Sequence, residues 1–380
     1  MIIAILKETA PERRVCMTPD LLPRLKALGA EVWVESGAGV EAYLSDSDYA
    51  RAGAELKPRS ELLVSADLLI SIQPLGFSEL EKMKAEAWWV GVFQPLYQRP
   101  LVEKLLSLGL TSFSLDMIPR TTRAQAMDVL SSQATVAGYL AVLEAARRLP
   151  RFFPMLMTAA GSIAPAKVLV IGAGVAGLQA IATARRLGAV VDAFDTRPEV
   201  KEEVQSLGAR FVDVEGAADA SQAGGYAVEQ TEEYKKRQAE KIAQYAAKAD
   251  VIITTAQIPG RKAPLLITEE MVKAMKPGSV IVDLAAASGG NCALTENNKI
   301  VQYHGVTIVG QSNFPSEMPG DASRMFAKNV YNFLNLLINK EKGLHLNLDD
   351  DIVAGCCITH KGQIISGRVK EMFQNQMVKQ

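Results

Sequence analysis

One stretch near the middle of the chain constrains the fold more than any other. Residues 168–177 read VLVIGAGVAG, an apolar run that leads directly into Gly-x-Gly-x-x-Gly. A helical pattern closed by Gly188 follows, and a second apolar run, residues 190–194, ends at Asp195. This order predicts a strand, a tight turn, a helix and a second strand, the arrangement that binds the pyrophosphate of a dinucleotide.

Each glycine of the motif has a physical task. Gly172 allows the tight turn off the strand, Gly174 lets a pyrophosphate approach the backbone, and Gly177 lets the helix pack closely on the strand. The free N–H groups at the start of the helix, where its dipole is positive, then face the phosphates. Asp195 is placed to accept hydrogen bonds from both hydroxyls of the adenosine ribose.

The same acid bears on the choice between NAD and NADP. The carboxylate of Asp195 would repel a 2′-phosphate, which favours NAD. Arg197 supports the alternative, because an arginine at this place can accommodate that phosphate. We predict NAD(H) as the cofactor.

Composition limits the class of protein. A chain of 380 residues, with 48% apolar and 22% charged residues, is long enough for two globular domains. The net charge of −1 gives no support for nucleic-acid binding. The apolar start of the chain stops at Lys7 and predicts a strand, not a signal peptide. The uncharged run Val168–Ala184 contains the glycine turn and is too short for a membrane span, so we expect a chain that does not itself cross a membrane.

The four cysteines do not indicate a disulfide framework. Cys16, Cys292, Cys356 and Cys357 are too few and too scattered, and adjacent residues on a strand point to opposite faces. No set of cysteines and histidines has the spacing of metal ligands, so we predict no metal site. The interpretation is a cytoplasmic protein with reduced thiols.

The first 118 residues alternate short apolar runs with helical patterns, which predicts a parallel sheet with helices on its faces. The expected helices are Thr18–Leu28 and Leu101–Leu108. The expected strands are Ile2–Leu6, Glu31–Glu35, Asp67–Gln73, Trp88–Phe93 and Thr111–Leu115.

A long helical pattern, Met127–Leu149, links this domain to the next. Beyond the glycine strand and the Asp195 strand we expect strands at 210–214, 251–255 and 280–284, then an amphipathic helix, Ala322–Lys340, and a hairpin over 352–366. The prediction is an α/β protein of two Rossmann-like domains, with parallel sheets flanked by helices and separated by a cleft. The first domain is residues 1–128 completed by 311–380, and the NAD(H)-binding domain is residues 129–310.

The position of the histidines bears on the chemistry. His304, His345 and His360 all lie beyond residue 300. A dehydrogenase that reduces a carbonyl must move a proton with the hydride, and histidine is the usual agent, although lysine or a carboxylate can replace it. Direct hydride exchange between two nicotinamides needs no proton relay, only positioned rings and the exclusion of water.

Four polar residues before and within the long helix are candidates for the nicotinamide end of the site. Asp128 can accept from a carboxamide NH2, Gln125 can donate or accept, and Arg120 can donate to an amide oxygen or a phosphate. If the helix continues through them, Gln125, Asp128 and Ser131 lie near one face. By spacing alone, a capped and solvated helix start is the simpler interpretation.

The segment RTTRAQAMDVLSS, residues 120–132, closely resembles the RQD loop of the NAD(H)-binding component (domain I, alpha subunit) of proton-translocating nicotinamide nucleotide transhydrogenases. The resemblance starts at KETAPERRV, residues 7–15, and spans essentially the whole chain. It continues through residues 170–184, 193–201, 223–227, 258–260, 276–285 and 289–292.

The resemblance implies roles for these residues. Arg120, Gln125, Asp128 and Ser131 would hold the nicotinamide end of NADH, with Gln125 reaching toward the partner's nucleotide. Tyr226 would lie on a loop that closes over bound nucleotide. We expect catalysis to depend on Gln125, Asp128 and Arg120. The other expected cofactor-binding residues are Gly172, Gly174, Val175, Ala176, Gly177, Asp195, Thr196, Arg197, Ala256 and Gln257.

The resemblance also implies partners. Hydride would pass from NADH to NADP+ held on a separate NADP(H)-binding component (domain III), in the Re/Si-specific reaction of this family. A membrane component (domain II) would couple the transfer to proton translocation. The chain is then expected to be a homodimer in the cytoplasm, peripherally associated with the inner (cytoplasmic) membrane through its partner subunits.

Two other functions stay open. Alanine dehydrogenase shares the fold, and its family handles pyruvate with an arginine, a lysine and a histidine. Arg14 matches the arginine, but the place of the lysine is Ser71 and residues 92–95 contain no histidine, which argues against this activity. A non-catalytic NAD(H) sensor is the second alternative. Gln257 departs from the transhydrogenase pattern, which commonly has leucine there.

Overall fold

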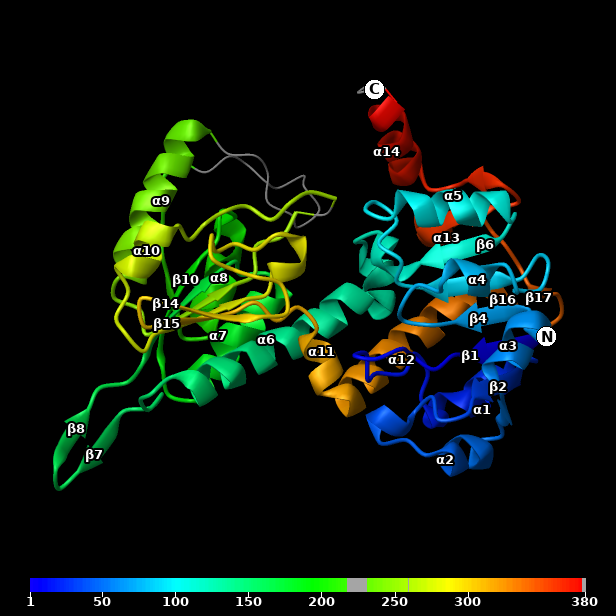
Figure 1. Ribbon diagram of the computed structural model, residues 1–380, viewed down its shortest axis with the longest axis horizontal. Helices are drawn as coiled ribbons and strands as arrows, with labels where there is room; N and C mark the ends of the chain where they lie inside the picture. The colour runs from blue at the N-terminus through cyan, green and yellow to red at the C-terminus, as the bar shows by residue number, and fades with distance from the viewer. Residues whose placement is uncertain (217–230, 259, 378–380) are drawn as a thin grey trace. The chain divides into compact units, whose positions relative to one another are not determined.

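The computed structural model describes residues 1–216, 231–258 and 260–377. The chain divides into two compact units (Figure 1). Unit 1 comprises Met1–Gln133 and Pro315–Gln380, and unit 2 comprises Ala134–Phe314. Helix α6 (Val129–Arg148) contributes its first residues to unit 1 and the remainder to unit 2.

Unit 1 is built on an eight-stranded sheet with the order β19-β18-β6-β5-β4-β1-β2-β3. Strands β1 to β6 are mutually parallel, whereas β18 pairs antiparallel with both β6 and β19. The last segment of the chain therefore completes the sheet begun by the first. The strands are β1 (Ile2–Ile5), β2 (Glu31–Glu35), β3 (Glu55–Lys57), β4 (Leu68–Ile70), β5 (Trp88–Gly91), β6 (Thr111–Ser114), β18 (Cys357–His360) and β19 (Gln363–Ile364).

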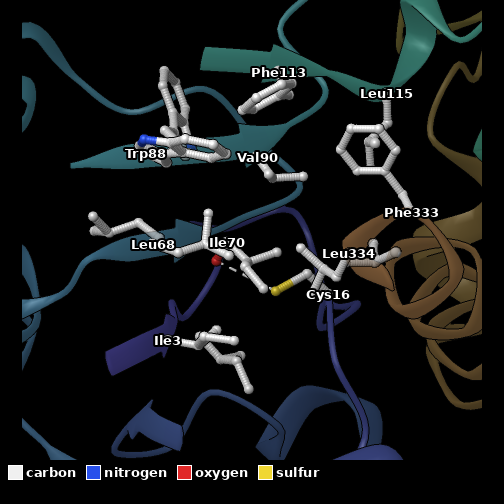
Figure 2. Close-up of a cluster of buried hydrophobic side chains, with 14 of the residues drawn as sticks. Ile3, Cys16, Leu68, Ile70, Trp88, Val90, Phe113, Leu115, Phe333 and Leu334 are labelled. Atoms are coloured by element: carbon white, nitrogen blue, oxygen red, sulfur yellow. Dashed lines mark hydrogen bonds between the residues drawn. The ribbon is translucent and has the colours of Figure 1, made fainter. Parts of the chain in front are cut away.

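The core of unit 1 forms where this sheet meets helix α12. Figure 2 shows the strand residues Leu68, Ile70 and Val90 in one cluster with Phe333 and Leu334 of α12 (Pro319–Leu337), and all five side chains are fully buried. The helices of unit 1 are η1 (Pro19–Leu21), α1 (Leu22–Ala27), η2 (Val40–Ala42), α2 (Asp46–Arg51), α3 (Arg59–Ser65), α4 (Phe77–Leu80), α5 (Arg99–Ser107), η3 (Leu115–Met117), η4 (Thr122–Met127), α12 (Pro319–Leu337), α13 (Asp351–Cys356) and α14 (Gly367–Met377). A small ribbon of β16 (Ile338–Asn339) and β17 (Gly343–Leu344) follows α12.

The five strands expected in the first 118 residues are confirmed, most of them shorter by one to four residues. The hairpin expected over residues 352–366 is wrong in its first half. Asp351–Cys356 is a helix because the Asp350 side chain caps it, accepting hydrogen bonds from the backbone N–H groups of Ile352 (2.9 Å) and Val353 (3.3 Å). The hairpin itself comprises only β18 and β19, which turn at Lys361 and Gly362.

Unit 2 is a seven-stranded sheet with the order β11-β10-β9-β12-β13-β15-β14, in which only the edge strand β14 is antiparallel among the described strands. This is the strand order of a dinucleotide-binding fold, with the crossover point at β9. The strands are β9 (Lys167–Ile171), β10 (Val190–Phe194), β11 (Arg210–Phe211), β12 (Val251–Thr254), β13 (Val280–Asp283), β14 (Ile300–Tyr303) and β15 (Val306–Val309).

The central strand of unit 2 is apolar on both faces because helices cover both. Val168 and Val170 pack into one core with Ile181 of α7, and Leu169 and Ile171 pack into a second core. Such a strand is a continuous apolar run rather than an alternating one, as the sequence shows. The helices are α7 (Val175–Arg186), η5 (Pro198–Val200), α8 (Lys201–Ser206), α9 (Glu232–Ala246), α10 (Glu269–Lys273) and η6 (Ala286–Ser288). Helix α11 (Phe314–Glu317) spans the boundary at which the chain returns to unit 1.

A two-stranded hairpin that the sequence patterns did not predict precedes β9. Its strands are β7 (Leu156–Thr158) and β8 (Gly161–Ile163), and it extends away from the sheet of unit 2 in Figure 1. Its side chains are largely exposed: Met157 is 78% accessible to solvent and Met155, just before it, 60%.

Helix α6 is the one described helix that is long and apolar enough to cross a membrane by length and composition, a test that core helices of soluble proteins also pass. Ala141, Val142 and Ala145 of this helix are fully buried in the core of unit 2. A Cβ added at Gly138 would lie 2.1 Å from the carbonyl oxygen of Ala176. The part of α6 that follows Gln133 is therefore packed tightly against unit 2.

Candidate functional site

The glycine turn of unit 2 has the geometry that its sequence predicts. Gly172 has φ +100°, and a Cβ there would lie 2.4 Å from the hydroxyl oxygen of Thr255. A Cβ at Gly177 would lie 1.8 Å from the carbonyl oxygen of Gly172, so helix α7 contacts the end of β9 directly. Around Gly174 a Cβ would meet nothing within 4 Å. The backbone of the turn is therefore open at the one glycine where a pyrophosphate needs access.

Asp195, which directly follows β10, is bonded to this turn. Its Oδ2 accepts a hydrogen bond from the backbone N–H of Ala173 at 2.7 Å. Arg197 donates to the same carboxylate through Nε and a terminal nitrogen, both at 2.9 Å. Hydrogen bonding to Asp195 raises the pKa of the Arg197 guanidinium. The arginine that could have accommodated a 2′-phosphate is thus held by a carboxylate, an arrangement that favours NAD.

On the other side of β9, Asn291 organises the segment that follows β12. Its side-chain oxygen accepts from the N–H of Ala256 (3.0 Å), and its NH2 group donates to the carbonyls of Ala256 (2.9 Å) and Pro264 (2.8 Å). The backbone N–H of Asn291 in turn donates to Asp283, a fully buried carboxylate at the end of β13, at 2.7 Å. The sequence patterns placed residues 289–292 only within the resemblance and gave no sign of this role.

The condition that would place Gln125, Asp128 and Ser131 near one face of a helix is not met, because the three residues do not share one helix. Gln125 lies in the 3-10 helix η4, and Asp128 has an extended conformation (φ −74°, ψ 92°) before α6 begins at Val129. Asp128 caps α6: its carboxylate accepts from the N–H of Ser131 at 2.9 Å and from the Ser131 hydroxyl at 2.5 Å. The helical conformation is interrupted at Asp128 because an aspartate can satisfy the free N–H groups at the start of the next helix. Arg120 and Gln125 are exposed.

The remaining sequence-predicted residues are placed as follows. Val175 and Ala176 begin α7, Thr196 lies between Asp195 and Arg197, and Ala256 with Gln257 follows β12. The side chain of Gln257 donates to the carbonyl of Leu284 at 3.0 Å. The glycine turn, Asp195 and Ala256 thus belong to unit 2, whereas residues 120–131 belong to unit 1. Tyr226 lies outside the described residues.

Arg14 is neutralised from within the protein. Its guanidinium makes two parallel bonds to Glu12, at 2.8 and 2.7 Å, and a third to the side-chain oxygen of Gln133 at 2.7 Å. Burial alone would raise the pKa of Glu12, but the hydrogen bonds and charge of Arg14 hold that pKa below its ordinary value. Bidentate bonding of this kind is how arginine recognises a carboxylate ligand. Glu12 therefore pairs with Arg14 in the geometry by which arginine binds a carboxylate.

The position expected for a substrate lysine is a buried serine in the structure. The Ser71 hydroxyl donates to the carbonyl of Gln73 at 2.8 Å and accepts from the indole N–H of Trp89 at 3.0 Å. Close to it, the buried carboxylate of Glu8 accepts from the backbone N–H groups of Ile72 (2.6 Å) and Gln73 (2.9 Å). Burial raises the pKa of Glu8 to about 7, and the sequence patterns had not singled out this residue.

A parallel sheet with a glycine turn at its crossover point, and an acid at the end of the next strand, defines a dinucleotide-binding protein of the Rossmann class. The chain belongs, more narrowly, to the alanine dehydrogenase/PNT family. Residues 4–137 match the model described as alanine dehydrogenase/PNT, N-terminal domain, and residues 141–367 match the corresponding C-terminal domain.

The relatives of this chain include both transhydrogenases and alanine dehydrogenases. The chain is 49% identical over 375 residues to the first part of the NAD(P) transhydrogenase subunit alpha of Rhodospirillum rubrum, covering 96% of this chain and 98% of the relative. The crystal structure of a transhydrogenase from Sinorhizobium meliloti superimposes with a TM-score of 0.88 at 43% identity, covering 96% of this chain and 100% of that one. An L-alanine dehydrogenase structure gives a TM-score of 0.82 at 25% identity, covering 99% of each chain. The resemblance to the transhydrogenases is confirmed, with alanine dehydrogenase the more distant relative.

Proposed function

We propose that this chain is the NAD(H)-binding component of a proton-translocating NAD(P) transhydrogenase. It would transfer hydride between NADH and NADP+ held on a partner component. The observation that carries the choice between the two activities named in the family is the bidentate pair of Glu12 and Arg14. With this arginine paired to Glu12 and serine at position 71, two of the three positions by which the alanine dehydrogenase family handles pyruvate are changed or already engaged.

The proposed cofactor site in unit 2 follows the Rossmann pattern. The open backbone at Gly174 and the N–H groups of Val175 and Ala176 at the start of α7 would bind the pyrophosphate. Asp195 and the adjoining Thr196 would bind the adenosine ribose. Further cofactor contacts are assigned to Gly172, Gly177, Arg197, Ala256 and Gln257.

The nicotinamide end is assigned to Arg120, Gln125, Asp128 and Ser131. Each oxygen of the Asp128 carboxylate has room for a second hydrogen bond beyond the one to Ser131, so the helix cap and carboxamide binding are compatible. Arg120 and Gln125 are exposed, which leaves them accessible to a nucleotide carried by another protein. Tyr226 is proposed to close over bound nucleotide.

The reaction requires these residues to position the nicotinamide ring but not to transfer a proton. Bound NADH would supply a hydride, a proton with two electrons, and the acceptor ring would take the whole hydride as one C–H bond breaks and another forms, so no side chain has to deliver or remove a proton. The protein has to orient the ring, exclude water and leave one ring face open to the second nucleotide. The capped, hydrogen-bonded start of α6 supplies a fixed anchor for the carboxamide in this scheme.

Several wider aspects of the proposal rest on the family. The partners are the NADP(H)-binding component and a membrane component that couples hydride transfer to proton translocation. The chain is proposed to act as a homodimer in the cytoplasm, peripheral to the inner membrane. The exposed hairpin β7–β8 supports a dimer, because a two-stranded hairpin with apolar side chains in water is only marginally stable alone.

The direct test mixes the purified chain with NADH and a transhydrogenase NADP-binding component loaded with NADP+. Rapid, partner-dependent oxidation of NADH is expected, and alanine with NAD should give no NADH without the partner. Tight NADH binding with no transfer to a partner that is active with another family member would instead identify a nucleotide sensor. Alanine oxidation by the chain alone would overturn the assignment.

A further inference from the structure

The loop that carries Gln125 is tied to helix α12 by two side-chain amides. The carbonyl oxygen of Ala126 accepts a hydrogen bond from Nδ2 of Asn329 at 2.9 Å and from Nδ2 of Asn332 at 2.8 Å. Both asparagines lie more than 200 positions along the chain from Ala126, three residues apart on one face of the same helix. All three residues belong to unit 1.

Ala126 lies where the backbone pattern changes. The 3-10 helix η4 ends at Met127, Asp128 is extended, and α6 begins at Val129. A backbone carbonyl at such a break loses the regular helical donor and needs another. Here α12 supplies two donors, so the break itself is fixed between Gln125 on one side and Asp128 on the other.

Helix α12 is a firm support for this purpose. Phe326, Val330 and Phe333 are at most 1% exposed and pack into the core of unit 1. Asn329 is 8% exposed, and its side-chain oxygen has no hydrogen-bond partner. A buried amide with an unpaired oxygen is costly, and an apolar residue would pack there without that cost. The amide is therefore present for its N–H group, whose acceptor is the loop.

We propose that Asn329 and Asn332 are positioning residues for hydride transfer, acting through Gln125 and Asp128. This inference rests on the proposed function, in which those two residues hold the nicotinamide end of NADH. Ala124 and Met127 keep the loop packed in the core of unit 1, but without the two amides the carbonyl of Ala126 loses both its hydrogen bonds to α12. The ring would then lose its fixed distance from the second nucleotide. Hydride transfer is sensitive to displacements of about 1 Å, whereas binding of the adenosine half depends on unit 2 alone.

The test uses the full chain with two substitutions and a matched control. Asn332→Ala removes a half-buried amide, and Asn329→Leu removes the buried amide while filling its volume. Asn335→Ala is the control, because the Asn335 amide lies one turn further on α12 and, among the described residues, donates to the Tyr331 carbonyl of its own helix at 2.7 Å and not to the loop. Transfer to the NADP-loaded partner component is measured at saturating NADH, together with the affinities for NADH and for 5′-AMP.

Transfer at saturating NADH should fall on the order of tenfold in the double variant, with AMP affinity unchanged and the control like the parent chain. Asn332→Gln keeps an amide donor and should therefore transfer hydride faster than Asn332→Ala. Unchanged transfer in the double variant, with an active parent chain, would overturn this inference and leave the proposed function intact. Loss of AMP binding in step with transfer would also overturn it, because the asparagines would then support the whole fold. An inactive parent chain would overturn both this inference and the proposed function.

Discussion

At the scale of single residues, the glycine turn separates a requirement of the fold from a requirement of the ligand. Gly177 has the carbonyl of Gly172 against it, so the helix can pack on the strand only without a side chain. Gly174 has open space around it and φ −79°, a conformation that any residue adopts. The same motif therefore contains one glycine that the fold needs and one that only a bound pyrophosphate would need.

Gly174→Ala should accordingly leave thermal unfolding unchanged and weaken NADH binding on the order of tenfold, about 1.4 kcal/mol. Gly177→Ala should destabilise the protein by about 3 kcal/mol, because the backbone must shift to admit the methyl group. Calorimetry and fluorescence titration with NADH check both. If the methyl group added at position 174 left NADH affinity intact, the pyrophosphate would not lie on this turn.

Glu8 makes the stability of unit 1 depend on pH. Its folded pKa of about 7 lies above its ordinary value of 4.5, mainly because the carboxylate is buried; Glu12 adds to this rise and Arg14 opposes it. Between these pH values the folded chain keeps a proton that the unfolded chain has released. The free energy of unfolding should therefore fall as the pH rises from 4.5 to 7 and level off above, by about 3 kcal/mol.

Glu8→Gln removes the titration, although its NH2 group cannot accept one of the two backbone N–H bonds, which costs stability at every pH. The stability of the variant relative to the parent chain should therefore rise between pH 5 and pH 8. Denaturant unfolding at the two pH values measures the difference. An equal stability gap at both pH values would show that Glu8 does not retain its proton in the fold.

At the scale of elements, the sequence was informative where structure is local. The strand, turn, helix and strand around Gly172 were predicted because each depends on a few neighbouring residues, and the same is true of β2 and α12. The Glu12–Arg14 pair was missed although the two residues are close in sequence, because only the folded loop turns their side chains toward each other. Asn291 and Asn329 were missed because their partners are distant in the chain.

The segment that follows β12 illustrates such a long-range constraint. Asn291→Ala would remove three hydrogen bonds, two of them to Ala256, and leave those backbone groups to find other partners. We expect a loss of about 3 kcal/mol in stability, at about 1 kcal/mol for each bond. In the Rossmann pattern this segment faces the nicotinamide half, so NADH affinity should fall while 5′-AMP affinity is retained. Equal losses for both nucleotides would place Asn291 outside the nicotinamide half.

At the scale of the whole molecule, the most informative surface is the hairpin of unit 2. Met155, Met157 and Ile163 expose 60%, 78% and 41% of their area. The two strands of the hairpin have only three residues each. Water would favour covering these side chains, and a hairpin this short gains little stability from its own hydrogen bonds. A hollow lined in part by Phe152, Pro154 and Leu187 lies at the base of the hairpin. One surface therefore offers both projecting apolar groups and a place that can receive them, which suits two identical copies.

Met157→Glu should consequently convert the proposed dimer to monomers at micromolar concentration, because each interface would then have to desolvate two carboxylates in place of two apolar side chains. Light scattering after gel filtration gives the mass directly. Val64→Glu is the matched control, since Val64 is an apolar side chain of α3 in unit 1 that is 55% exposed. The melting curve of the isolated monomer should show a new low-temperature transition as the uncovered hairpin loosens. A Met157→Glu variant that keeps the dimer mass would show that the two copies meet elsewhere, and a parent chain of monomer mass would rule out the dimer.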